Sequence, residues 1–346
     1  MIATWMLVTL VLGALVAAAA WCASELAATR RLPMRWAWVG GMLLLVTLAA
    51  LTPWRRSTTT VMATLPASAL VAPTAVAPAT DAPTLAARLG AALEATRALA
   101  ERTLGGATTL ATPLQWLLAT LWLSATCAVL AVLALTWRRM RRARATWPVH
   151  DVDGLPVRIA PHGAPMVMGI TAPEIVLPAW ALALPAARRT LVLAHEREHV
   201  AARDPWLLAM AATIVALLPW HPAAWWMASR LARAIETDCD ARVLAAGVPV
   251  RDYGALLLDV AAVPCAPSLL APWPALGGER STLETRILAM TSRPSRHPLL
   301  RTGAFGAAAL ALVVVACDSS KLPTSAEVER MDASQATARV MAVSSA

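Results

Sequence analysis

The sequence predicts a mostly α-helical protein that crosses a membrane several times. Two observations predict this fold class. Of the 346 residues, 58% are hydrophobic and only 15% are charged, whereas a soluble domain carries roughly a quarter charged residues. In addition, four segments are apolar over most of the roughly 20 residues that a helix needs to cross a bilayer. This composition argues against an ordinary cytosolic enzyme, and also against a disordered chain, which would be poor in hydrophobic residues.

The first apolar segment lacks the basic residues that precede the apolar core of a cleavable signal peptide, so we expect it to be retained as a span. The second contains Gly40 and Gly41, which membrane helices tolerate. The third is long enough to tilt, and the fourth is the shortest. The four predicted spans are Ile2 to Trp21, Trp36 to Pro53, Leu114 to Trp137 and Thr302 to Ala316.

Arginine-rich loops indicate the orientation, because positively charged loops stay in the cytoplasm. One such loop follows the first span, another follows the third and another precedes the fourth. If all four spans cross the membrane, these three loops lie on the same side. Arg55 and Arg56, directly after the second span, fall on the other side and are the one dissenting pair. We attribute the net charge of +9 to headgroup contacts and expect no direct nucleic-acid binding. The arginines of these loops are Arg30, Arg31 and Arg35, then Arg138, Arg139, Arg141, Arg142 and Arg144, then Arg293, Arg296 and Arg301.

This orientation predicts a multi-pass protein of the inner (plasma) membrane. Its outer loop contains a linker from Ser57 to Pro83 and a helical pattern from Ala86 to Leu104, which is either a sensing element or a passive surface helix. The predicted organisation is two transmembrane helices within 1–53, an extracytoplasmic loop over 54–112, a third transmembrane helix over 113–137, a cytoplasmic domain over 138–301, a fourth transmembrane helix over 302–317 and a disordered extracytoplasmic tail over 318–346.

The predicted cytoplasmic domain contains the sequence LVLAHEREHV at residues 191–200. In a helix, His195 and His199 lie four residues apart on one face, a spacing that suits one Zn²⁺ ion. Glu196 follows the first histidine and could act as the general base for the attacking water. The apolar residues around the motif indicate a buried helix, in which unpaired histidine and glutamate side chains would be costly. We therefore favour metal binding over a solvated helix face.

A catalytic zinc ion needs a third protein ligand, and the segment ARAIETDCDARVL offers one. Glu236 could bind the ion, and Asp240, one helical turn further on, could accept the second N–H of a ligating histidine. Asp204 is another candidate for this supporting role. The alternative is that Glu236 and Asp240 form surface ion pairs with Arg233 and Arg242. Next to an HExxH motif, we favour the ligand interpretation.

The apolar stretch from Trp206 to Leu218 lies between the two halves of this site. If it crossed the membrane, His195 and Glu236 would lie on opposite sides and could not share an ion. At about 13 residues it is too short to span comfortably. The sequence therefore predicts a buried or interfacial helix followed by a turn.

Taken together, these blocks resemble the BlaR/MecR-type membrane zinc metallopeptidases, the antibiotic sensor-transducers and their relatives. The resemblance covers about Pro165 to Ile287 and the arrangement of spans, and it rests on PMVMGITAPEIVLP, HEREH, RDPW, WHPAAWW, ETDCD, RDYGALLL and LETRILAM, in this order. It implies a gluzincin-like helical domain with a small β-sheet on its N-terminal side. It also implies that Zn²⁺ is held by His195, His199 and Glu236, with Glu196 as the base.

The family's sensors carry a penicillin-binding domain with an SxxK motif, and no SxxK follows the last predicted span. We therefore do not expect sensing by acylation. The edge of the implied sheet near Met166 to Ile170 could bind substrate as an added strand.

The expected function is that of an integral-membrane zinc endopeptidase acting on a cytoplasmic protein. The resemblance implies that the substrate is a winged-helix transcriptional repressor, whose cleavage would transmit a signal. The other expected partners are the lipid bilayer and, as an option, a second copy of the chain. Two alternatives stay open. One is a non-enzymatic signalling or scaffold protein, with a structural zinc closed by a fourth ligand such as Cys239 or His221. The other is a quality-control protease that degrades damaged membrane proteins.

Overall fold

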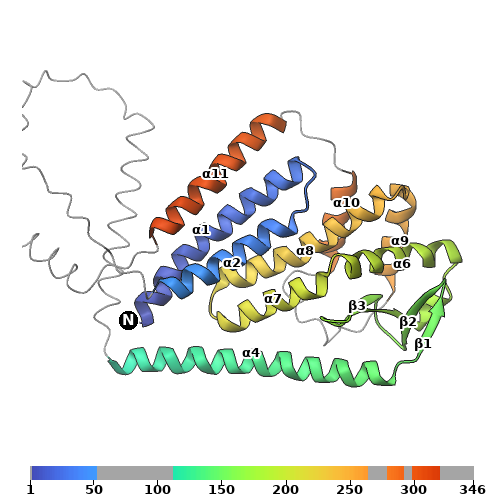
Figure 1. The fold of residues 1–346 in the computed structure, drawn as a ribbon, viewed down its shortest axis with the longest axis horizontal. Helices are drawn as coiled ribbons and strands as arrows, with labels where there is room; N and C mark the ends of the chain where they lie inside the picture. Colours follow the sequence, from blue (N-terminus) through green and yellow to red (C-terminus); the bar gives the residue numbers. More distant parts are fainter. Residues whose placement is uncertain (1, 53–111, 264–278, 292–297, 320–346) are drawn as a thin grey trace, which may run out of the picture. The chain divides into compact units, whose positions relative to one another are not determined.

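The computed structural model describes residues 2–52, 112–263, 279–291 and 298–319 (Figure 1). These residues form a mostly helical chain with one small mixed sheet. The predicted outer loop, with its linker and its helix over 86–104, lies outside the described residues. So does the predicted tail beyond residue 319.

Three of the described helices are long and apolar enough to cross a membrane, and these are α1 (Ile2–Thr29), α4 (Thr112–Thr146) and α11 (Pro298–Ser319). The second predicted span forms α2 (Arg35–Leu51), which has 17 residues and is about 26 Å long, slightly short of a hydrocarbon core of about 30 Å. The pair α6 and α7, bent by 57°, also passes the length and hydropathy criteria when counted as one span. The chain is thus a membrane protein by composition, and the four-span domain organisation stays a prediction.

A four-stranded sheet follows α4, in the order β1-β2-β4-β3. The strands β1 and β2 form an antiparallel hairpin, β2 and β4 are parallel, and β3 pairs antiparallel with β4. Asp153 and Gly154 close the hairpin with φ angles of 53° and 81°, the two positive values that a type I′ turn requires. The strands are β1 (Val149–Val152), β2 (Leu155–Ala160), β3 (Met166–Met168) and β4 (Glu174–Pro178).

The carboxylate of Glu174 in β4 joins the sheet to the arginine-rich end of α4. It accepts hydrogen bonds from both Arg158 of β2 and Arg144 of α4. The hydrogen bond from Arg158 lowers the pKa of the Glu174 carboxyl, partial burial opposes this effect, and Arg144 adds to the lowering. Arg144, which the sequence suggested as a headgroup anchor, therefore also contacts the protein.

Seven described helices follow the sheet, and four of them, α5, α6, α8 and α9, contribute buried residues to a hydrophobic core shared with it. The core combines Val157 and Leu177 of the sheet with Val192 and Leu193 of α6 and with Tyr253, Leu256 and Leu257 of α9. This packing buries one face of α6, the helix that carries the HExxH motif. Besides α11, these helices are α5 (Ala179–Leu182), α6 (Ala186–Ala201), α7 (Asp204–Leu217), α8 (Pro222–Ala245), α9 (Val250–Ala262) and α10 (Glu279–Thr291).

The junction between α6 and α7 is a sharp bend at Arg203, which has a left-handed φ of 54°. Pro205 then suits the first turn of α7, where a missing N–H costs nothing. The stretch from Trp206 to Leu218 forms most of α7, and Pro222 begins α8, which lies beside α7 (Figure 1). The predicted helix and turn are thus present, and α7 buries residues such as Leu207 and Val215, while the position of this helix relative to the bilayer stays a prediction. The bend and the α7–α8 pairing return the chain to the HExxH helix.

Gly169 lies just after β3 with a φ of +107°, and a Cβ at this position would lie 2.4 Å from the carbonyl oxygen of Ala172. Gly154 also has a positive φ, +81°, but a Cβ there would meet nothing within 4 Å. We expect Gly169→Ala to destabilise the protein by roughly 3 kcal/mol and Gly154→Ala by roughly 1 kcal/mol, because only the first adds a backbone clash to the conformational strain. Thermal unfolding of the purified full chain checks this difference, and equal shifts in the midpoint would contradict it.

Candidate metal centre

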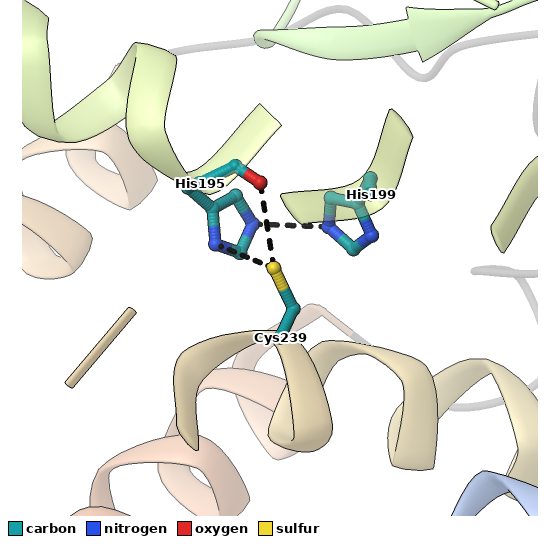
Figure 2. A group of neighbouring side chains, drawn as sticks. All are labelled: His195, His199 and Cys239. Atoms are coloured by element: carbon teal, nitrogen blue, oxygen red, sulfur yellow. Dashed lines mark hydrogen bonds between the residues drawn. The ribbon is translucent and has the colours of Figure 1, made fainter. Parts of the chain in front are cut away.

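The HExxH helix places two imidazoles against each other. His195 and His199 project from the same face of α6, and their Nε2 atoms are 3.2 Å apart, as Figure 2 shows. Both rings are largely shielded from solvent, with side-chain exposures of 13% and 9%. The i, i+4 spacing thus brings two imidazole nitrogens to one point.

Glu236 approaches this point from α8. Its Oε2 atom lies 3.6 Å from Nε2 of His195, and its Oε1 atom lies 3.6 Å from Nε2 of His199. The carboxylate therefore faces both nitrogens at once, and the Glu236 side chain is 36% exposed to solvent. Two imidazole nitrogens and a carboxylate form the ligand set of a zinc site that leaves one coordination position open.

Cys239, one turn after Glu236 on α8, contacts the other ring nitrogen of His195. Its Sγ atom lies 3.3 Å from Nδ1 of His195 and donates to the carbonyl oxygen of the same residue at 3.4 Å. His195, His199 and Cys239 each offer a ligand atom, and these atoms lie within 4.8 Å of one another (Figure 2). Two donor sets, one with Glu236 and one with Cys239, thus share the two histidines.

The Nδ1 atoms of both histidines have protein partners. Nδ1 of His199 lies 2.8 Å from Oδ2 of Asp204, at the start of α7. Nδ1 of His195 lies 2.8 Å from the hydroxyl of Tyr253, which in turn donates to Oδ1 of Asp240 at 2.7 Å. The Tyr253 hydroxyl proton is used on Asp240, so its oxygen accepts from Nδ1–H of His195. With Nδ1 of each ring used in this way, Nε2 is the atom left for a metal ion, and it faces Glu236.

The predicted supporting residues thus lie where hydrogen bonds can orient the histidines. Asp204 contacts His199 directly, whereas Asp240 lies 3.7 Å from Nδ1 of His195 and reaches it through Tyr253. Both carboxylates are almost completely buried, with exposures of 2% and 1%. A buried carboxylate behind a ligating imidazole fixes the ring and raises its basicity.

Arginine side chains balance the negative charge of these carboxylates. Arg286 of α10 donates to both oxygens of Asp240, at 2.8 and 2.7 Å, and lies 3.2 Å from Oε2 of Glu236. Arg35, at the start of α2, donates to Asp204 at 2.9 Å. A forked guanidinium–carboxylate pair is the geometry that stabilises such buried charges best.

Arg233 and Arg242, the surface partners that the sequence offered for Glu236 and Asp240, contact other groups. Arg242 donates to Glu198 at 2.9 Å and lies 3.5 Å from Asp204. Arg233 donates to the carbonyl oxygen of Ser229 at 3.3 Å. Glu236 and Asp240 instead meet in Arg286, which favours a buried site over solvated ion pairs.

The electrostatics of the site favour a cation between the two histidines. Burial lowers the pKa of each imidazole, but the neighbouring groups outweigh it. Hydrogen bonding to Cys239 and Glu236 raises the pKa of His195 to about 10, and hydrogen bonding to Asp204 and Cys239 raises the pKa of His199 to about 11. The surroundings therefore stabilise positive charge at the point where the two Nε2 atoms meet, and the donor set fits a divalent metal ion.

The two glutamates of the site differ in their environment. Burial raises the pKa of the Glu196 carboxyl above its usual range, while the charges of His195 and His199 act in the opposite direction. Burial also raises the pKa of Glu236, but interaction with His195 and the charges of His199 and Arg286 outweigh it and leave that pKa well below its usual range. Glu236 is thus suited to bind a cation as an anion, and Glu196 is suited to exchange protons.

His221 lies away from the site. It precedes α8, so the rise of that helix places it about 22 Å from Glu236. Its ring packs so closely on α1 that a Cβ at Gly13 would lie 2.0 Å from its Cε1 atom.

Sequence reasoning did not assign Tyr253, Arg286 or Arg35 to the site. Tyr253 and Arg286 occur in RDYGALLL and LETRILAM. These two blocks contributed to the family resemblance, but no function was predicted for any residue in them. Arg35 was interpreted only as a positive charge near the membrane. Their roles depend on contacts across long stretches of chain, which spacing within one helix does not reveal.

Comparison with known proteins agrees with these observations. No curated protein matches the chain. A family model described as BlaR1 peptidase M56 matches residues 5–290, which includes the apolar helices α1 and α2, the sheet and the candidate metal centre. The resemblance to the BlaR/MecR type is thereby confirmed, and the chain belongs to the BlaR1 peptidase M56 family of membrane-associated metallopeptidases.

Proposed function

We propose that the chain is a membrane-embedded, zinc-dependent endopeptidase whose ion is held by Nε2 of His195, Nε2 of His199 and the carboxylate of Glu236. One observation carries this proposal. Tyr253 and Asp204 occupy the two Nδ1 atoms, which leaves the Nε2 atoms for an ion, and each Nε2 lies 3.6 Å from a Glu236 oxygen. Three donors of this kind leave a position for substrate or water.

The chemistry follows from the groups around this point. When bound, the ion would polarise the scissile carbonyl and make a water nucleophilic near neutral pH. Glu196 takes the proton of the attacking water and returns it to the leaving nitrogen, for which a carboxyl with a raised pKa is suited. Arg286 keeps the Glu236 carboxylate in place, since it contacts Glu236 and Asp240 together.

The substrate is proposed to bind along β3. This strand forms one edge of the sheet and pairs only with β4 within it. It also contacts α6, the helix of the HExxH motif. An extended peptide that pairs with β3 as an added strand would pass beside the candidate metal centre, and its main chain rather than its side chains would provide most of the binding.

The proposed site faces the cytoplasm of a cell with the protein in its inner (plasma) membrane. Support comes from Arg35, because this residue of the arginine-rich α1–α2 turn donates to Asp204 beside His199. The site therefore lies on the same side as Arg30, Arg31 and Arg35, and positive loops stay inside. Family membership supports a cytoplasmic protein substrate, and we propose a winged-helix transcriptional repressor, whose cleavage would transmit a signal.

A second candidate function is a signalling or scaffold protein with a structural zinc. The position of Cys239 favours it, because a thiolate that joined the two histidines and Glu236 would complete four ligands and close the site. The contact of Cys239 with Nδ1 of His195, rather than with Nε2 of that ring, favours the open site.

The ligand set can be tested by zinc stoichiometry on the purified full chain. We expect one zinc per wild-type chain, loss of most of it in Glu236→Ala and retention in Cys239→Ala, because the carboxylate and not the thiol faces both Nε2 atoms. Cobalt substitution adds a second measurement, since a thiolate ligand produces a charge-transfer band that carboxylate does not. Zinc loss in Cys239→Ala, together with that band in the wild type, would favour the structural site.

The role of Glu196 can be tested by Glu196→Gln, which keeps the shape of the side chain but removes the base. We expect cleavage of a denatured protein substrate to fall by at least roughly 100-fold, with zinc still bound. Glu198→Gln is the matched control, because Glu198 lies in the same motif but is paired with Arg242 at 2.9 Å. Proteolysis that persists in Glu196→Gln, or that is lost equally in both variants, would contradict the mechanism.

A further inference from the structure

The beginning of α2 is attached to α8 by two hydrogen bonds. The backbone N–H groups of Met34 and Arg35 donate to Oδ1 and Oδ2 of Asp238, both at 3.0 Å. The first amides of a helix have no partner within the helix, so Asp238 caps α2 from a neighbouring helix. The carboxylate is 7% exposed, which makes this a buried attachment of the α1–α2 turn.

The side chain of Arg35 makes a second attachment, which leads to a candidate metal ligand. Nη1 of Arg35 donates to Oδ1 of Asp204 at 2.9 Å, and Oδ2 of Asp204 lies 2.8 Å from Nδ1 of His199. All three residues are buried, with exposures of 8%, 2% and 7%. The first residue of α2 is thus connected to a histidine of the metal centre through a single carboxylate.

Asp204 can orient His199 only while its own position is defined. Oδ2 also has Arg242 at 3.5 Å, but Oδ1 takes its hydrogen bond from Arg35. Hydrogen bonds weaken steeply with distance and misalignment, and an unpaired buried carboxylate is costly. A small displacement of the start of α2 would therefore change both the charge balance of Asp204 and the orientation of the His199 ring.

We propose that Arg35 is a positioning residue that acts through Asp204 to hold His199 in its metal-binding orientation, so that the α1–α2 pair sets the metal affinity of the site. This inference rests on the proposed function, because it requires His199 to bind the ion. Apolar helices on either side of the α1–α2 turn would then be coupled to the candidate active site without any movement of the sheet. Coupling of this kind is reciprocal, so metal binding would in turn stabilise the α1–α2 turn.

The test is zinc affinity of the purified full chain, measured by competition with a chromogenic chelator. We expect Arg35→Ala and Asp204→Ala each to weaken zinc binding by about 10- to 100-fold, the range for residues that support a ligating histidine. The double variant should be no weaker than Asp204→Ala, because Arg35 acts through that carboxylate. Arg35→Lys should lose less zinc affinity than Arg35→Ala, since lysine keeps the positive charge.

Arg30→Ala is the matched control. It removes the same charge from the same turn, but Arg30 is exposed and contacts Thr302 at 3.2 Å. We expect its zinc affinity to stay at the wild-type value. A second readout is amide hydrogen exchange at Met34 and Arg35, which zinc should slow in the wild type and not in Arg35→Ala.

The outcomes separate this inference from the proposed function. Wild-type zinc affinity in Arg35→Ala, or losses that add up in the double variant, would overturn the coupling and leave the zinc site intact. An equal loss of zinc affinity in Arg30→Ala would also overturn the coupling, because a general effect of positive charge would then explain the loss. A wild-type chain that binds no zinc would instead overturn the proposed function, and the inference with it.

Discussion

The structure depends on one constraint, which is that two histidines and the two buried carboxylates behind them, Asp204 and Asp240, must all be paired in the interior. Such groups are stable away from water only when each has a partner. His199 is paired with Asp204, His195 with Tyr253 and Asp240, and the carboxylates with arginines. The partners come from α2, α7, α8, α9 and α10, so this one requirement defines how five helices pack around α6.

The arginines that balance these carboxylates also connect the apolar helices with the helices of the candidate metal centre. Arg35 belongs to an apolar helix, and Arg286 belongs to α10, which precedes the apolar α11 in the sequence. Their guanidinium groups contact Asp204, Asp240 and Glu236. The apolar helix α2 and the candidate metal centre are therefore joined by direct contacts. If the centre binds an ion as proposed, a displacement of α2 would alter a hydrogen bond rather than a whole domain.

Much of this arrangement was predictable from local patterns. Apolar runs indicated the membrane helices, and the i, i+4 spacing brought His195 and His199 together. Glu236, Asp240 and Asp204 were selected by residue type near the motif, and all three lie beside the histidines. Tyr253, Arg286 and Arg35 were not predictable in this way. Each lies far along the chain from the histidine it supports, and an arginine that balances a buried carboxylate looks, in the sequence, like one that meets a lipid headgroup.

By itself, the sequence determined the membrane character, the helix with the HExxH motif and the carboxylates available to complete a site, because these depend on composition and on periodicity within one helix. Only the tertiary structure decided which nitrogen of each histidine faces Glu236. It also placed Tyr253 between His195 and Asp240, and Cys239 on the Nδ1 side of His195. The reason is physical, since the tautomer of a histidine is set by the partner that its second nitrogen meets in space.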